Sequence, residues 1–351
     1  MRTENSRQSK WKIAAAAVIT GVVLGILTCT FLNAVREQLW KQSINTILES
    51  TQQGRNTLQV QLEEDYQTLS NIADYLHQAD QPDMLDSQLT NYGQMDEGVS
   101  LYQENGVCLP SGTQADEAVA LALMDNEKAY GVLDPHISSV TGVNVFNLFI
   151  RMAMSDGSTA YLVKEYEVGA IVDSFSLSFY QNSGFSYVVD VDGNVLIRPP
   201  HPNSNKTVQN LYDILRESGN GEDSLQLFTE SLAGAKTGWA VLSYQGEQTV
   251  FCYIPLKMGS DWYLVSIIPQ AVVSAQTNQI IRQTLTLIAA IITGIALLVA
   301  LYFYYARQTA KRLRSQADYI GHLYNAVPEG IALLTMERPY RFIQLNREGL
   351  R

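Results

Sequence analysis

Two long apolar stretches without a charged residue, Ile13–Val35 and Thr284–Ala306, constrain this chain more than any other feature. Each exceeds the roughly 20 residues that a helix needs to cross the hydrocarbon core of a bilayer. Neither contains Asp, Glu, Lys or Arg, and each of these would cost about 2.5–3.5 kcal/mol at the membrane centre. We therefore predict two transmembrane helices that bracket one large polar segment.

Basic residues lie before the first stretch and after the second, between each stretch and the nearer end of the chain. Four precede the first stretch and four closely follow the second: Arg2, Arg7, Lys10, Lys12, Arg307, Lys311, Arg312 and Arg314. The positive-inside rule then places both termini in the cytoplasm and the polar segment outside the plasma membrane. The first stretch is also a candidate signal peptide. However, its apolar core is longer than the usual 7–15 residues or so, and Leu32-Asn33-Ala34 is a poor cleavage site, which favours an uncleaved anchor.

The polar segment is strongly acidic. Of the 35 acidic residues, 30 lie within Arg36–Arg282 together with 12 of the 24 basic ones, so this segment carries a formal charge of −18 and the remainder +7. Such a charge argues against nucleic acid or an anionic membrane face as the partner of this segment. It does not restrict the choice of a small ligand.

The polar segment begins with a pattern typical of a long helix. Residues 36–80 contain no proline and one glycine, and Leu62, Leu69 and Leu76 recur on one face. At 1.5 Å per residue a helix of this length would extend about 60 Å. We predict that its apolar stripe docks on the following domain or on a partner chain, and that Pro82 marks its end.

Two lobes of mixed helix and strand are predicted after this helix. In the first, Asn105-Gly106 indicates a hairpin, and the alternation within Asn144–Met154 predicts a strand with one buried face. The expected elements of this lobe are strands at Val99–Gln103, Val107–Leu109, Asn144–Met154, Thr159–Tyr166 and Glu167–Phe175, and a helix at Ala115–Tyr130.

The second lobe is also predicted to contain antiparallel strands and a helix. Asp192-Gly193 predicts another hairpin turn, and Val208, Leu211, Tyr212 and Leu215 mark one face of a short helix. The expected strands are Phe185–Val191, Asn194–Arg198, Trp239–Tyr244, Gln248–Leu256 and Trp262–Ile268. Two successive lobes of helix and antiparallel sheet favour the α+β class.

This order of elements between two spans resembles the double Cache family of extracellular bacterial sensor domains. The similarity covers roughly Leu39–Thr277, and its most specific motif is the strand–Asp-Gly–strand hairpin Tyr187–Leu196 (YVVDVDGNVL). Further similar segments are Tyr253–Leu256 (YIPL), Asp261–Val265 (DWYLV) with Pro269, the loop Asp134–Gly142, and Val168–Asp173 as a strand that ends in an aspartate. The resemblance implies two PAS-like antiparallel-sheet lobes beside the long helix.

After the second span, His322–Ile331 (HLYNAVPEGI) and Phe342–Glu348 (FIQLNRE) resemble the start of a PAS domain. Only about thirty residues are present, fewer than such a domain needs for its own core. We therefore expect either a fragment or a truncated receptor. The predicted segments are a cytoplasmic N-terminus (1–12), the first span (13–35), the long helix (36–80), a distal lobe (81–180), a proximal lobe (181–278), the second span (283–306), a linker (307–318) and an incomplete PAS domain (319–351).

The sequence contains no constellation that predicts catalysis or a bound metal. The four histidines are scattered, and no nucleophile elbow or phosphate-binding glycine loop occurs. Asp190–Asn194 is similar to the start of a calcium loop, but His201 stands where a bidentate Glu is needed, so a hairpin turn is favoured. We expect a protein that is not an enzyme and holds no cofactor.

The family resemblance implies a small-molecule site in the first lobe, which would be the membrane-distal one. The candidate ligand-binding residues are Tyr130, His136, Asn144, Tyr161 and Asp173. Each has a structural alternative: a core position for the two tyrosines, a surface loop for His136 and a helix cap for Asp173. Amino-acid-binding members carry an Arg and a Trp just before a Tyr, whereas this chain reads Glu127-Lys128-Ala129-Tyr130. An α-amino acid ligand is therefore not predicted.

The sequence thus predicts the sensory part of a bacterial transmembrane receptor that binds a small molecule. Its output module, a histidine kinase or a diguanylate cyclase, is not within this sequence. Gly21 and Gly25 fit the small-xxx-small pattern of close helix packing, so we expect a homodimer or pairing with a full-length receptor. The alternative is a two-span cell-surface scaffold or adhesion protein, and an exported hydrolase has no motif in its favour.

Overall fold

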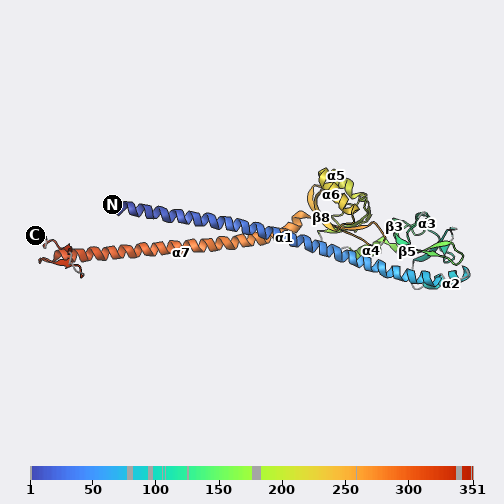
Figure 1. Ribbon diagram of the computed structural model, residues 1–351, viewed down its shortest axis with the longest axis horizontal. Coiled ribbons are helices and arrows are strands. Elements are labelled where there is room, and N and C mark those ends of the chain that lie inside the picture. Colours follow the sequence, from blue (N-terminus) through green and yellow to red (C-terminus); the bar gives the residue numbers. More distant parts are fainter. Residues whose placement is uncertain are drawn as a thin grey trace. The chain divides into compact units, whose positions relative to one another are not determined.

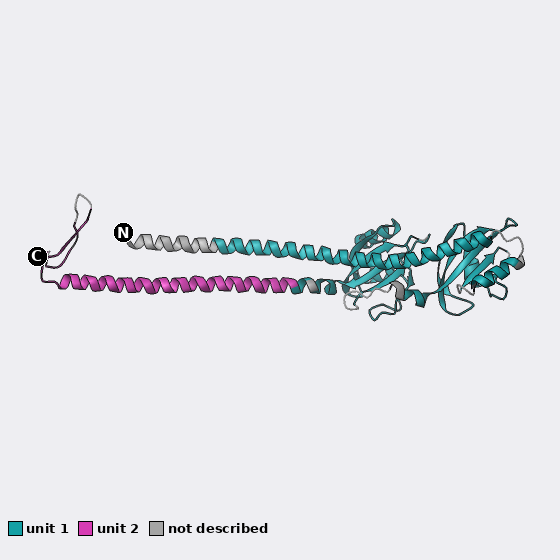
Figure 2. Cartoon of the chain, turned by 90° about the horizontal axis from the view of Figure 1, so that it is seen from below, with its two compact units in different colours: residues 1–279 teal, residues 280–351 magenta. Residues whose placement is uncertain are grey.

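The computed structural model describes residues 2–76, 82–93, 98–104, 106, 108–124, 126–175, 183–257, 259–336, 342–348 and 350. The chain divides into two compact units, residues 1–279 and 280–351 (Figure 2). The first unit contains a long helix and two five-stranded antiparallel sheets, and the second contains most of another long helix and a two-stranded sheet (Figure 1). Mixed helix and antiparallel sheet agree with the predicted α+β class.

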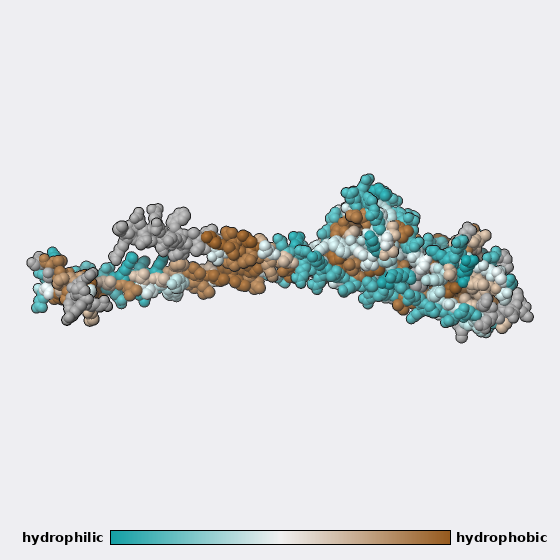
Figure 3. Space-filling model, viewed as in Figure 1, coloured by the Kyte–Doolittle hydropathy of each residue, from teal (hydrophilic) through white to brown (hydrophobic). Residues whose placement is uncertain are grey.

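Helix α1 (Arg2–Leu76) is continuous from the first apolar stretch through the predicted long helix. The predicted apolar stripe is confirmed, because Leu62, Leu69 and Leu76 are all fully buried in the core of the first unit. Helix α7 (Gln270–Ala326) contains the second apolar stretch. Both helices are long and apolar enough to cross a membrane, and each exposes a hydrophobic band (Figure 3). That they do cross one stays a prediction.

The first lobe comprises residues 82–175 and contains a sheet of strand order β2-β1-β5-β4-β3. Its elements are α2 (Pro82–Gly93), β1 (Val99–Gln103), β2 (Cys108–Leu109), α3 (Glu117–Met124), β3 (Tyr130–Ile137), β4 (Asn144–Ala153), β5 (Thr159–Glu167) and α4 (Val168–Phe175). One face of the sheet packs on α1 through residues such as Phe146 and Leu162. The other face packs on α3 through Phe149 and Val163, and we call it the outer face.

The prediction that β4 has one buried face is corrected, because both faces of the sheet are covered. The alternating pattern predicted one buried face, yet Phe149 and Asn147, on the side predicted to face solvent, are also buried. The reason is that α3 lies over the outer face and contributes Val119 and Leu123 to a second apolar cluster. A period of two identifies the two sides of a strand but not what covers each side.

Two further expectations for the first lobe were wrong. The segment predicted as a strand, Glu167–Phe175, is helix α4 from Val168, because Val168, Ile171 and Val172 have helical spacing and are buried together. The predicted helix Ala115–Tyr130 ends at Met124, and β3 begins at Tyr130. Pro135 is tolerated there because β3 is an edge strand with an irregular register between Leu133 and His136.

The second lobe comprises residues 183–269 and contains a sheet of strand order β7-β6-β10-β9-β8. Its elements are β6 (Phe185–Val189), β7 (Val195–Ile197), α5 (Leu211–Glu217), α6 (Glu222–Ala233), β8 (Gly238–Tyr244), β9 (Glu247–Pro255) and β10 (Tyr263–Pro269). Helices α5 and α6 cover one face, and α1 packs on the other through Ile44 and Ile47. All five strands were predicted, whereas α6 was not.

The second unit ends in a small hairpin. Strands β11 (Ala332–Leu334) and β12 (Phe342–Leu345) pair antiparallel after α7. The Asn346 side chain is buried, accepts a hydrogen bond from Ile331 N at 2.9 Å and donates to Glu329 O at 2.8 Å. The asparagine therefore ties the end of β12 to the start of β11. The identification of this segment as the start of a PAS domain stays a prediction.

Candidate functional site

The five ligand-binding residues expected from the sequence do not lie together. Tyr130 is on the face of the first sheet that meets α1, where its ring lies 4.7 Å from the ring of Tyr66. Tyr161 is on the outer face, where it is buried and its hydroxyl donates to Asn126 O at 2.8 Å. The two aromatic side chains therefore lie on opposite faces of the sheet and do not line one cavity.

The other three candidates are also dispersed. His136 shares the outer face with Tyr161, but their partners Val145 and Arg151 are six residues apart on β4, about 20 Å along the strand. Asn144 is exposed at the start of β4. Asp173 lies in α4, and its side chain is outside the described part of the structure. Of the five, His136 alone among the described side chains joins a polar cluster.

That cluster, here called the Asp116 cluster, consists of Asp116, His136, Ser138 and Ser139 beneath the N-terminus of α3. Asp116 is 2 % exposed, and its carboxylate accepts from Ala118 N at 3.0 Å, as expected of a helix N-cap. His136 Nε2 lies 3.2 Å from Asp116 Oδ2. Burial alone would raise the pKa of Asp116, but hydrogen bonds from the Ser138–Ser139 turn, Ala118 N and His136 outweigh it and lower the pKa.

Next to this cluster lie two hydrogen-bond acceptors, Asn147 and Glu165, here called the acceptor pair. They are direct cross-strand partners on β4 and β5 and face the same side of the sheet. Asn147 is 2 % exposed, and its Oδ1 receives no hydrogen bond within the described part of the chain. Burial, and then the charge of Asp116, raise the pKa of Glu165 although His136 opposes them. The acceptor pair is therefore suited to a donor that the protein does not itself provide.

Sequence reasoning missed Asp116, Asn147 and Glu165. Asp116 carried one available signal, since an aspartate directly before an apolar helical run is a typical N-cap. Asn147 was predicted to lie on the solvent-facing side of its strand, and Glu165 was not singled out. Only the packing of α3 over the outer face makes them part of a buried polar group.

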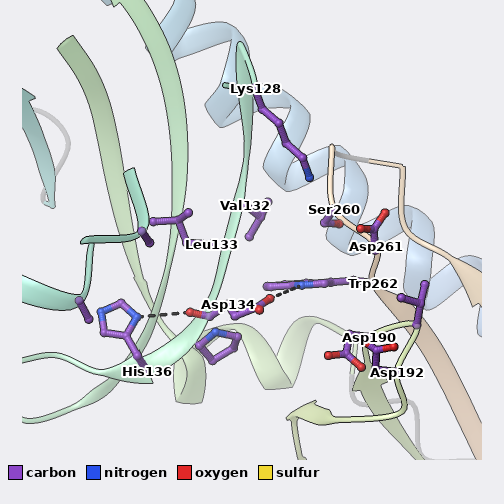
Figure 4. Close-up of a pocket in the computed structure, with 14 residues that line it drawn as sticks. Lys128, Val132, Leu133, Asp134, His136, Asp190, Asp192, Ser260, Asp261 and Trp262 are labelled. Carbon is purple, nitrogen blue, oxygen red and sulfur yellow. Dashed lines mark hydrogen bonds between the residues drawn. The ribbon is translucent and has the colours of Figure 1, made fainter. Parts of the chain in front are cut away.

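A cavity of about 490 Å³, here called the interlobe cavity, lies between the two lobes of the first unit (Figure 4). It is bounded by α3 and β3 on one side and by the β6–β7 turn and the segment before β10 on the other. At its floor Trp262 Nε1 donates to Asp134 Oδ1 at 3.0 Å, and Lys128 Nζ donates to Gly259 O at 3.0 Å. These two bonds link the first lobe directly to the segment that enters β10.

The β6–β7 turn in the cavity wall is the segment with calcium-loop similarity. Asp190 accepts hydrogen bonds from Asn194 N at 2.8 Å and from Asn194 Nδ2 at 2.7 Å, and Gly193 has a φ of +84°. These are the contacts of a tight hairpin turn, as predicted. Within the described residues, no group of three or more His, Cys, Asp or Glu side chains is arranged to hold a metal ion.

Comparisons with known proteins agree with this architecture. The sequence profile of the Cache domain family matches residues 32–277. The ligand-binding domain of the Pseudomonas aeruginosa PAO1 amino acid chemoreceptor PctB, in complex with L-Gln, aligns with a TM-score of 0.51 at 16 % identity over 65 % of this chain and 91 % of that one. The ligand-binding domain of the Pseudomonas fluorescens chemoreceptor CtaA, in complex with L-isoleucine, aligns with a TM-score of 0.52 at 15 % identity over 70 % and 98 %. No curated protein matches.

At these identities the solved structures establish the fold, and the profile establishes the family. It spans the part of α1 that enters the first unit's core, both sheets and the start of α7. The chain belongs to the Cache domain family.

Proposed function

We propose that residues 36–279 form the extracytoplasmic sensor domain of a bacterial transmembrane receptor that detects a small molecule. Membership of the Cache family supports this role, as does the presence of a candidate span at each end of the domain. The solved structures of similar fold, PctB and CtaA, are ligand-binding domains of chemoreceptors with an amino acid bound. In this proposal the domain binds and relays, and it performs no catalysis.

The ligand sits on the outer face of the first lobe, against the acceptor pair. The single observation that carries this assignment is the buried Oδ1 of Asn147, which accepts no hydrogen bond within the described residues although it lies beside the Glu165 carboxylate. Native proteins rarely leave such an atom without a donor. An ammonium group supplies three donors and a charge complementary to Glu165. We therefore assign the ligand to the amines.

A carboxylate on the ligand is not required by this site. Lys128, the cation nearest to Tyr130 in sequence, donates to Gly259 O in the interlobe cavity rather than toward the outer face. The amino acid ligands of PctB and CtaA carry both an amine and a carboxylate, so they belong in the test. An amine that lacks the carboxylate is the preferred candidate.

The route of the signal runs from β3 to β10. Asp134 of β3 bonds Trp262, whose buried ring lies 5.6 Å from that of Phe146 in the shared core. Tyr263 begins β10 directly after Trp262, and β10 continues into α7 without a loop. A ligand that favours one arrangement of β3 thereby biases the strand that enters the second candidate span. The proposed receptor is a homodimer that packs through Gly21 and Gly25. It carries a cytoplasmic PAS segment and signals through a kinase or cyclase output module.

Thermal unfolding of the full chain in detergent, against a panel of amines and amino acids, tests this function. A ligand at 100 times its dissociation constant stabilises the fold by about 2.7 kcal/mol, which is readily measured. Glu165→Gln removes the charge of the acceptor pair and should abolish the shift, whereas Asn144→Ala on the same sheet should keep it. A shift that survives Glu165→Gln rejects the site. No shift with any compound would instead favour a scaffold that binds a partner protein.

A further inference from the structure

A polar groove of about 270 Å³ lies between α1 and the first turns of α7, both within the first unit, and we call it the juxtamembrane groove. On α1 it is lined by Asn33, Arg36, Glu37 and Trp40. The spacing of these four residues, i, i+3, i+4 and i+7, places them on one face of the helix.

The opposite wall is equally polar. Gln270, Ser274, Thr277 and Asn278 line it from α7, again at the spacing of one helix face. Together the two walls present amide, hydroxyl and guanidinium donors to the same space. This composition is suited to the oxygens of a phosphate ester.

The positive charge of Arg36 favours an anionic ligand in this groove. Its neighbour Glu37 is engaged by Lys41, whose Nζ lies 2.7 Å from Glu37 Oε1. Among the described residues no carboxylate forms an ion pair with Arg36. Because Glu37 is paired with Lys41, the Arg36 guanidinium can bind a phosphate in a planar, two-bond geometry that Lys cannot form.

The end of the groove nearest the predicted spans, at Arg36 and Asn278, reaches the headgroup layer of a bilayer. Arg36 directly follows the predicted first span, and Asn278 precedes the predicted second span by about 8 Å at 1.5 Å per residue. The headgroup layer is roughly 5–8 Å thick on each side of the core. Trp40 and Trp239 form an edge-to-face pair with ring centroids 6.5 Å apart beside the groove, and tryptophan is enriched at this depth.

We infer that the juxtamembrane groove binds the phosphodiester headgroup of a phospholipid, with Arg36 on the phosphate and the amide and hydroxyl side chains of α7 on its remaining oxygens. The inference rests on the membrane placement in the proposed function but not on its ligand site. A lipid held between the two helices would contact both elements through which a signal leaves the domain.

Native mass spectrometry of the full chain in detergent, titrated with palmitoyl-oleoyl phosphatidylglycerol, measures this binding. We expect one lipid to bind with an affinity at least fivefold higher than in Arg36→Gln. Lys206→Gln makes the same change of charge at an exposed position of the second lobe that does not line the groove, and should alter the affinity less than twofold. Circular dichroism of both variants checks that α1 stays helical.

Three results would overturn the inference. Equal loss in Arg36→Gln and Lys206→Gln would indicate unspecific attraction by charge. Equal binding of a diacylglycerol, which has no phosphate, would indicate hydrophobic adsorption. Displacement by glycerol 3-phosphate at a similar concentration would assign the groove to a soluble phosphate ester. Glu165→Gln should keep the lipid while it loses the amine, which separates this inference from the proposed function.

Discussion

Replacing Asn147 by Leu should stabilise the ligand-free protein while it destroys ligand binding. Asn147 is 2 % exposed, and its Oδ1 accepts no hydrogen bond in the described structure. A buried polar group left without a partner costs about 1–3 kcal/mol. Leucine is similar in shape and would extend the apolar cluster that Phe149 and Leu133 form beneath α3. We therefore expect the free energy of unfolding to rise by about 1–3 kcal/mol.

Thermal unfolding of the full chain measures the effect. For a domain of this size each kcal/mol raises Tm by about 2–4 °C. Asn144→Leu is the matched control, because Asn144 begins the same strand and is exposed, so its Tm should change by less than the equivalent of about 0.5 kcal/mol. The Tm shift caused by an amine ligand should disappear in Asn147→Leu and persist in Asn144→Leu.

A lower Tm for Asn147→Leu would refute the reasoning, because the asparagine would then make a stabilising contact. A higher Tm combined with an unchanged amine shift would keep the energetic argument and reject the acceptor pair as the site. The interlobe cavity would become the candidate in that case, since His136 also lines it.

Three further substitutions test the fold and the electrostatics. Glu165→Gln should raise stability at pH 7 and leave it unchanged below pH 4.5, the ordinary carboxyl value. The pKa of Glu165 is raised in the folded protein, so ionising this carboxyl destabilises the fold. The destabilisation is absent below pH 4.5, where the carboxyl is protonated in both states, and appears as pH rises through the folded-state pKa. Urea unfolding at pH 7 and below pH 4.5 measures the difference. Trp262→Phe removes the hydrogen bond to Asp134 and should cost about 1–2 kcal/mol in the same assay. Gly259→Ala should lower Tm more than Gly246→Ala, because both glycines have positive φ but only at Gly259 would a Cβ meet a carbonyl oxygen, at 3.0 Å.

Each of these expectations has a contrary result. A stability gain in Glu165→Gln that persists at acidic pH would show that ionisation is not its cause. An unchanged unfolding free energy in Trp262→Phe would remove the link between the lobes from the proposed route. Equal losses in the two glycine variants would show that the segment before β10 does not approach β3 closely in solution.

The sequence predicted the strands better than the helices. Hairpin turns such as Asp192-Gly193 and alternating runs such as Trp262–Ile268 are local signals, and the corresponding strands form where expected. Helix α4 was taken for a strand because its eight residues are too few to display a period clearly. Helix α6 was not predicted, although Leu225, Phe228 and Leu232 have helical spacing, two acidic residues lie in its first turn and Gly234 follows its last residue.

The candidate site could not be predicted from one sequence because it depends on which element covers which face. Resemblance to the family selected Tyr130 and Tyr161, which carry aromatic and hydroxyl groups suited to a pocket, yet they lie on opposite faces of the sheet. Asn147 is buried on the face of the sheet that α3 covers. Neither period nor spacing in the sequence shows which face α3 covers.

A small buried hydroxyl network joins α1 to β10, the strand that continues into α7. Thr51 Oγ1 of α1 donates to Ile47 O at 2.7 Å and lies 2.8 Å from Ser266 Oγ of β10, which in turn lies 2.9 Å from Ser186 Oγ of β6. All three hydroxyls are fully buried, so sliding α1 along β10 would break the Thr51–Ser266 hydrogen bond where water cannot replace it. Each such bond contributes about 0.5–1.5 kcal/mol, which is comparable to the 1–3 kcal/mol or so that couples two sites in an allosteric protein. In the proposed relay, we therefore expect Thr51→Val to alter the coupling between the ligand site and α7, which the response of a full-length receptor would measure.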